Sequence, residues 1–172
     1  MKSPPPAGYT TVAPWIVTPD TEQLLDFVAT VFDGVELGRV RLEDGSIGHA
    51  EIRVGDTVLL AFDQRPNWPA MPALLRVFVA DADATIERAA SAGARVVTAS
   101  ATQAFGQRGG RVRDAFGNIW WISAVVEEVA PEVGMRRLAE PRYAEAMRIA
   151  QETLDRELSG NSGSAVSRPV TG

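Results

Sequence analysis

The chain runs twice through one order of secondary-structure signals, and this repetition limits its possible folds more than any other feature. In the first half, a strand pattern, a helical pattern and three further strand patterns follow one another at residues 9–17, 24–32, 35–42, 47–54 and 57–62, with Asp20 or Thr21 as the helix cap. The second half repeats this order at residues 74–79, 81–92, 94–98, 110–114 and 118–125. The helix entries also correspond, as VTPDTEQLLDF and VADADATIERA. A period of about 60 residues is typical of an internal duplication. We therefore predict an α+β fold of two tandem β-α-β-β-β modules that form a curved mixed sheet around a cavity.

The segments outside the two repeats have their own composition. We expect a flexible leader, a two-module domain divided at about 9–64 and 73–126, a helical extension and a disordered tail, at residues 1–8, 9–126, 127–158 and 159–172. In the extension, Pro141 suits a first helical turn. An apolar stripe then follows on one face of the predicted C-terminal helix: Tyr143, Met147, Ala150 and Leu154.

Composition and charge exclude several classes of protein. The chain has 45 % hydrophobic residues, no cysteine and a net charge of −5, so disulfides and thiolate metal sites are excluded. A nucleic-acid backbone or an anionic membrane would repel such a chain on average. No apolar run is long enough to span a bilayer, and the start of the chain lacks the apolar stretch of a secretory signal. These features predict a cytoplasmic protein with neither nucleic acid nor membrane as a partner.

Three local motifs resemble one known superfamily. IGHAEIRVGDTVLLAFD is similar to its third and fourth strands, QAFGQRGGRVRDAFG to its seventh strand and turn, and DAFGNIWWIS to its closing hairpin. Together with the order of elements, they resemble the bacterial glyoxalase-like branch of the vicinal oxygen chelate superfamily. That superfamily includes glyoxalase I, bleomycin-resistance proteins and extradiol dioxygenases. The resemblance covers about residues 10–125 and implies the two-module fold.

The resemblance also implies where a metal site would lie. Members often bind a metal through one ligand on each of the first, fourth, fifth and eighth strands, usually His, Glu, His and Glu. The corresponding positions in this chain are expected at Ala13, Leu60, Leu74 and Trp121. None of these side chains offers the imidazole or carboxylate that a divalent ion requires. We therefore predict no cofactor, with a divalent metal as the alternative.

The same resemblance implies a ligand cavity floored by Trp121. Strand alternation places Ile119 and Ser123 on the face of Trp121, and Trp120 on the helix-packed face. The predicted ligand-binding residues are Trp121, Leu60, Phe62, Leu74, Arg76, Phe105 and Trp68. The alternatives are that Trp121 fills the core, that Trp68 plugs the sheet rather than acting as a lid, and that Arg76 pairs with Glu51 rather than with a ligand acid.

Three functions remain open from the sequence. The leading hypothesis is metal-independent binding of a small apolar or aromatic molecule, as in drug or metabolite sequestration. The alternative is an enzyme of the superfamily, a lyase, isomerase or dioxygenase, with a noncanonical divalent metal site around His49 and Glu51. His49 could then act as a general base, or it could lie on a solvated strand face. The third is a degenerate domain that makes protein–protein contacts. A homodimer is expected, with the C-terminal helix as a contact surface.

Overall fold

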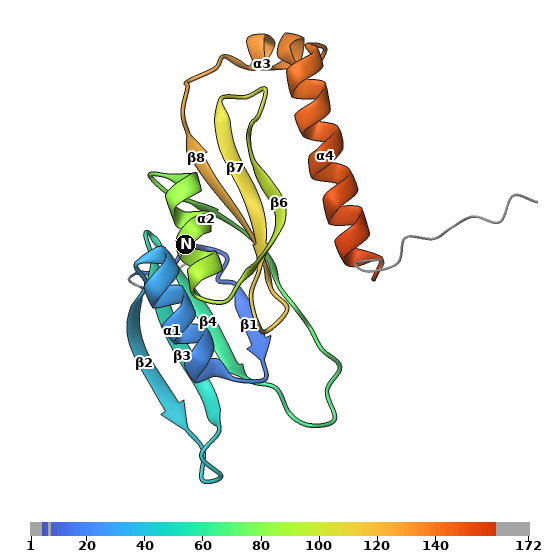
Figure 1. Cartoon of the computed structure of the whole chain (residues 1–172). Helices are drawn as coiled ribbons and strands as arrows, with labels where there is room; N and C mark the ends of the chain where they lie inside the picture. The colour runs from blue at the N-terminus through green and yellow to red at the C-terminus, as the bar shows by residue number, and fades with distance from the viewer. Residues whose placement is uncertain (1–4, 7, 161–172) are drawn as a thin grey trace, which may run out of the picture.

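The structure, a computed structural model, describes residues 5–6 and 8–160 and contains both predicted modules (Figure 1). The first module comprises β1 (Trp15–Thr18), α1 (Thr21–Phe32), β2 (Val35–Arg41), β3 (Ile47–Val54) and β4 (Thr57–Asp63). The second comprises β5 (Leu74–Phe78), α2 (Ala82–Ser91), β6 (Arg95–Thr102), β7 (Gln107–Arg113) and β8 (Ile119–Val125). Most of the expected leader and nearly all of the expected tail lie outside the described residues.

Each module forms its own four-stranded mixed sheet. Sheet A has the strand order β1-β4-β3-β2, and sheet B has the equivalent order β5-β8-β7-β6. In each sheet, the first strand of the module runs parallel to the last strand, and the other pairs are antiparallel. The predicted α+β fold of two β-α-β-β-β modules is thus confirmed, with two sheets where the sequence suggested one curved sheet.

The helices begin and end where polar residues can cap them. Asp20 accepts a hydrogen bond from the backbone N–H of Gln23 and caps α1, and Asp81 caps α2 in the same way through Ala84. At the other end of α1, Asp33 takes a left-handed conformation with φ of 54°, which short polar side chains tolerate better than most. These caps set the point at which each helix returns to its sheet.

The two modules share one hydrophobic core. Helices α1 and α2 lie next to each other (Figure 1). Trp120 of β8 is fully buried and contacts two rings of α1 in the other module, with centroid separations of 6.3 Å to Phe27 and 5.0 Å to Phe32. Trp120 therefore lies on the helix-packed face, as predicted. Because one cluster of buried side chains spans both modules, neither module has a complete core alone.

A buried carboxylate fixes the hairpin that carries Trp120. Asp114 is 5 % exposed and accepts four hydrogen bonds, from the backbone N–H groups of Phe116 and Asn118, the Asn118 side-chain amide and the Trp120 indole, at 2.8 to 3.0 Å. It therefore satisfies two backbone donors of the tight turn, the Asn118 amide and the polar atom of the largest fully buried side chain.

The C-terminal extension contains two helices where the sequence suggested one. α3 covers Pro131–Arg137, and α4 covers Pro141–Leu158, so α4 begins at the predicted proline. Figure 1 shows α4 beside β6, on the side of sheet B opposite to α2. Tyr143 and Ala150 of the apolar stripe are buried. The stripe thus packs against the chain's own residues. Homodimerisation stays a prediction, and the stripe does not supply its contact surface.

No helix in residues 5–6 and 8–160 combines the length and the apolar character needed to cross a membrane.

We expect Asp114→Ala to lower the free energy of unfolding by about 3 kcal/mol, because it leaves several buried donors without an acceptor. Urea unfolding followed by circular dichroism would measure the loss. The matched control is Asp26→Ala, an exposed substitution on α1, which should change stability by no more than about 0.5 kcal/mol. Equal losses in the two variants would contradict the role of Asp114.

Candidate functional site

Each sheet has one face that carries neither α1 nor α2, and we call these the open faces. On sheet A, the strand register aligns Trp15 of β1 with Leu60 of β4 and Glu51 of β3 in one row. The sequence placed Ala13 at this position of the first strand. That expectation is wrong, because β1 begins only at Trp15 and residues 11–14 precede it as an irregular segment.

The equivalent row on sheet B differs from the prediction in the same way. Arg76 of β5 pairs with Trp121 of β8, whereas Leu74 pairs with Ile119. Arg76 and not Leu74 is therefore the neighbour of Trp121. The row continues through Arg111 of β7, and each of these side chains lies on the open face because strand alternation directs Trp120 to the other side.

The four corrected positions do not fit a metal ion. They are Trp15, Leu60, Arg76 and Trp121, which supply two indoles, an alkyl group and a cation. None of these side chains donates an electron pair to a divalent ion. Within the described part of the chain, no group of three or more His, Cys, Asp or Glu side chains is placed to hold one. The residues that the fold brings to the superfamily's metal positions are thus aromatic, aliphatic and cationic.

Aromatic side chains gather on the open face of sheet A. The Trp15 ring meets His49 and Phe62 at centroid separations of 5.6 and 5.3 Å, and Phe62 meets Trp68 at 5.8 Å. All three contacts are edge-to-face, a preferred arrangement for aromatic rings. Trp15, Phe62 and Trp68, which we call the aromatic group, line a hollow of about 760 Å³. Trp15 is 51 % and Trp68 39 % exposed, so ring surface remains accessible.

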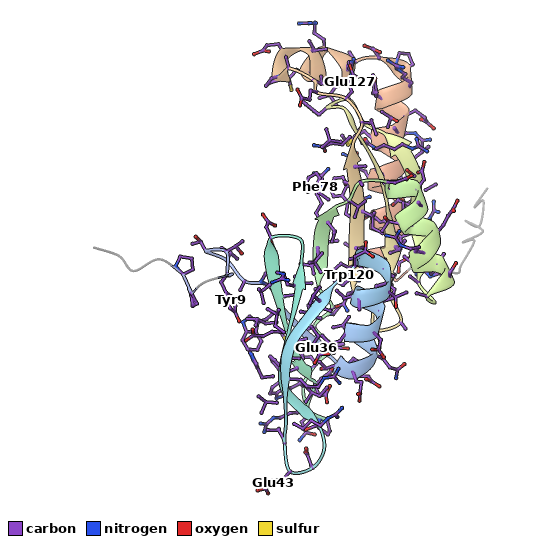
Figure 2. All side chains as sticks on the ribbon, turned by 90° about the vertical axis from the view of Figure 1, so that its left-hand side faces the viewer. Tyr9, Glu36, Glu43, Phe78, Trp120 and Glu127 are labelled. Carbon is purple, nitrogen blue, oxygen red and sulfur yellow. The ribbon has the colours of Figure 1, made fainter. Side chains whose placement is uncertain are left out.

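An acid–base pair borders the aromatic group. His49 Nε2 lies 2.9 Å from Glu51 Oε1. The pKa of Glu51 is lowered by His49 first and then by Tyr9, and the Glu51 carboxylate in turn raises the pKa of the Tyr9 phenol. Figure 2 shows Tyr9 on the side of sheet A away from α1. Glu51 is thus engaged by His49 and Tyr9 and does not pair with Arg76.

Trp121 lies between two arginines rather than on the floor of a cavity with the other predicted residues. The guanidinium carbons of Arg76 and Arg111 lie 4.1 and 4.6 Å from the Trp121 ring centroid. Leu60 is buried, whereas Leu74 is exposed at the edge of sheet B. The ring of Phe105, another predicted ligand-binding residue, packs against Gly134 of α3, where a Cβ would overlap it.

The predicted binding residues therefore do not line one common cavity. Phe62 and Trp68 line the hollow over sheet A. Arg76 instead lines a second hollow of about 670 Å³ at the junction of the modules. Sequence analysis missed Trp15 and the burial of Arg111. The place of Trp15 in the first strand could have revealed it. That strand was predicted to begin already at residue 9, and this early boundary obscured the position of Trp15.

Helix α4 is held over sheet B by two ion pairs to the buried carboxylate of Glu157. Glu157 is 5 % exposed and accepts hydrogen bonds from Arg95 and Arg113, each at 2.6 Å. Thr98 and Thr153 share a further hydrogen bond at 2.6 Å. Arg95, and then Arg113, hold the pKa of Glu157 below its usual range. Arg95 and Arg113 therefore share one counter-charge within the chain.

Comparison with known proteins agrees with this fold. The family model for the Glyoxalase/Bleomycin resistance protein/Dioxygenase superfamily matches residues 8–122. The chain belongs to this superfamily. The resemblance seen in the three sequence motifs is thus confirmed, and the absence of ligating side chains from the four metal positions distinguishes this chain from the metal-binding pattern described above.

Relatives in the superfamily come from several bacteria. Uncharacterized proteins of Mycobacterium bovis and Mycobacterium tuberculosis H37Rv are 36 % identical over an alignment of 129 residues, which covers 69 % of this chain and 85 % and 76 % of theirs. Among solved structures, TioX from Micromonospora sp. ML1 superposes with a TM-score of 0.57 at 23 % identity, covering 67 % of this chain and 98 % of TioX. A glyoxalase/bleomycin resistance protein/dioxygenase family enzyme from Burkholderia phytofirmans gives a TM-score of 0.54 at 18 % identity, covering 64 % of this chain and 94 % of that enzyme. These structures share the fold.

Acid should release α4 from sheet B. Because the pKa of Glu157 is lower in the folded chain than in the unfolded one, its stabilising effect is complete above the unfolded value of about 4.3 and is lost as pH falls through the folded value. We expect hydrogen exchange of α4 amides, followed by mass spectrometry, to accelerate relative to α2 below about pH 4 once corrected for intrinsic rates.

Two glutamate variants test whether Glu157 is the group responsible. Glu157→Gln should loosen α4 already at neutral pH and remove most of the pH dependence. Glu152→Gln, which alters an exposed ion pair with Arg148, should behave like the parent protein. If the exchange of α4 amides depended on pH in the same way in Glu157→Gln and in the parent protein, the ion pairs of Glu157 would not be what holds α4 on sheet B.

Proposed function

We propose that the protein binds a small, flat, partly aromatic molecule over the open face of sheet A and needs no metal to do so. The observation that carries this proposal is the aromatic group, in which three rings in edge contact line one hollow. Ligand sites are concave and mostly apolar, with a few polar groups that fix orientation. In the hollow over sheet A, the aromatic group supplies the apolar part, and side chains such as Asp63, Gln64 and Arg65 supply a comparable polar part.

The exposure of the rings supports binding rather than simple core packing. Trp120 shows how a core tryptophan of this protein is placed. It is fully buried, and its indole N–H donates a hydrogen bond to Asp114. Trp15 and Trp68 instead keep much of their surface in water, at a cost that stacking on a flat ligand would relieve. Trp68 lies in the loop between β4 and β5, where binding residues are common.

An enzymatic role for the same face is the second candidate. It is favoured by the hydrogen bond between His49 and Glu51, because a carboxylate that orients an imidazole is the usual arrangement of a general base. The Burkholderia phytofirmans neighbour is described as a family enzyme. A bound compound that is chemically converted by the parent protein and not by His49→Asn would favour this candidate over simple binding.

Removing the Trp68 ring should weaken binding without harming the fold. We expect Trp68→Ala to raise the Kd for a neutral aromatic such as indole or 2-naphthol about tenfold, because one stacking surface is lost. Calorimetric titration would measure the change. Met71→Ala, an exposed change in the same loop, should leave the Kd unaltered.

The proposal would be wrong if neutral aromatics failed to bind the parent protein at millimolar concentration. It would also be wrong if Met71→Ala and Trp68→Ala weakened binding equally, because the effect would then come from the loop and not from the ring.

A further inference from the structure

Two arginines flank one tryptophan on the open face of sheet B. We call Arg76, Trp121 and Arg111 the cationic clamp. They form one row across β5, β8 and β7, and both guanidinium groups lie within 5 Å of the indole ring, at 4.1 and 4.6 Å from its centroid. Each contact is a cation–π interaction. Placing two like charges on a single ring is unfavourable unless a negative group lies nearby.

The clamp has only neutral partners among the described residues. Arg76 donates to Ser123 Oγ at 3.2 Å and to Gln107 Oε1 at 2.5 Å. Arg111 donates to Thr98 Oγ1 at 3.3 Å and to the Ala150 carbonyl at 2.7 Å. Both arginines differ in this respect from Arg95 and Arg113 on the same sheet, which share the carboxylate of Glu157.

Burial makes the missing negative charge more costly. Arg111 is only 7 % exposed, and its Nε has no hydrogen-bond acceptor within the part of the chain that the structure describes. Its pKa is lowered, first by burial and then by the charge of Arg76, and burial also lowers the pKa of Arg76. A buried cation without a counter-charge is normally destabilising, and an anion would reverse this effect.

The clamp is accessible from its Arg76 end. β5 is an edge strand of sheet B, and Arg76 and Phe78 line the hollow of about 670 Å³ between the modules. Leu74 and Phe78, on either side of Arg76 along the strand, are 57 % and 58 % exposed. Figure 2 shows Phe78 on the side of the molecule away from α1 and α2. An apolar body can therefore lie beside the cation.

The carboxylates that border the same hollow have other partners. Asp81 caps α2, Asp33 lies 3.9 Å from Arg88, and Asp56 accepts a hydrogen bond from Thr57. None of them is paired with Arg76 in the described structure. The positive charge of the clamp thus remains available to a ligand.

We propose that the cationic clamp binds the negatively charged group of a flat organic acid, a carboxylate or a phosphate monoester. The planar guanidinium of Arg76 matches both groups through paired N–H donors, and the apolar part of the ligand packs on Phe78 and Leu74. This site shares no residue with the aromatic group over sheet A. Either site can therefore fail its test while the other stands.

Titration with small anions would test the clamp directly. The probes are benzoate, phenyl phosphate, inorganic phosphate and the neutral benzamide, followed by the ¹⁵N–¹H signals of tryptophan indoles and arginine Nε groups. The Trp121 signal would be assigned with Trp121→Phe. We expect benzoate or phenyl phosphate to shift the signals of Trp121 and Arg76, and benzamide to leave them in place. Comparison of benzoate with phenyl phosphate identifies the preferred group, and inorganic phosphate shows whether the ring is required.

Two arginine variants separate the clamp from general electrostatics. Arg76→Gln should raise the Kd of the preferred anion at least about tenfold, because a charge-assisted pair is lost. Arg65→Gln is the matched control, since Arg65 lies over another indole, that of Trp68, at 5.7 Å. It should leave the Kd unchanged. Arg76 is exposed on an edge strand, so its replacement spares the core.

Three results would overturn the proposal. One is an equal response of Trp121 to benzamide and to the anions. Another is a Kd that Arg76→Gln does not change. The last is an equal loss of affinity in Arg65→Gln, which would indicate nonspecific attraction to the surface.

Discussion

The parallel pairing of the first and last strand of each module is the constraint on which the two candidate sites depend. It aligns Trp15 with Leu60 in sheet A and Arg76 with Trp121 in sheet B. Because ligands for one ion must converge from neighbouring strands, these are the pairs that decide whether the fold can hold a metal. Neither pair offers an imidazole or a carboxylate. The same alignment instead produces an aromatic surface on one sheet and a cationic one on the other.

The rest of the structure keeps these two open faces in place. Trp120 packs against α1 of the other module and bonds to Asp114, so the helix-packed sides form one core. Helix α4 covers part of sheet B and is held by Glu157. It buries Arg111 while leaving Arg76 exposed at the sheet edge. The extension therefore desolvates one arginine beside Trp121 and leaves the other in contact with solvent.

Sequence patterns were sufficient for the fold because each element carried a local signal. The strand over Ile47–Val54 alternates from Ala50 onward, and Asp20 and Asp81 mark the helix starts. Side-chain neighbours were harder to predict, because register depends on pairing between distant segments. A shift of two residues on β1 and on β5 replaced Ala13 with Trp15 and Leu74 with Arg76. The position of the Phe105 ring and the burial of Arg111 depend on α3 and α4. How these helices pack on the modules cannot be predicted from a local sequence pattern.

The central claim is that this scaffold binds organic ligands through aromatic and guanidinium groups in place of a metal ion. The most direct test is a calorimetric titration of a neutral aromatic ligand into protein treated with EDTA and dialysed, beside untreated protein. The structure predicts the same affinity in both samples, because the four positions in question hold Trp15, Leu60, Arg76 and Trp121. Loss of binding after EDTA, with recovery on addition of one equivalent of a divalent ion, would contradict the claim.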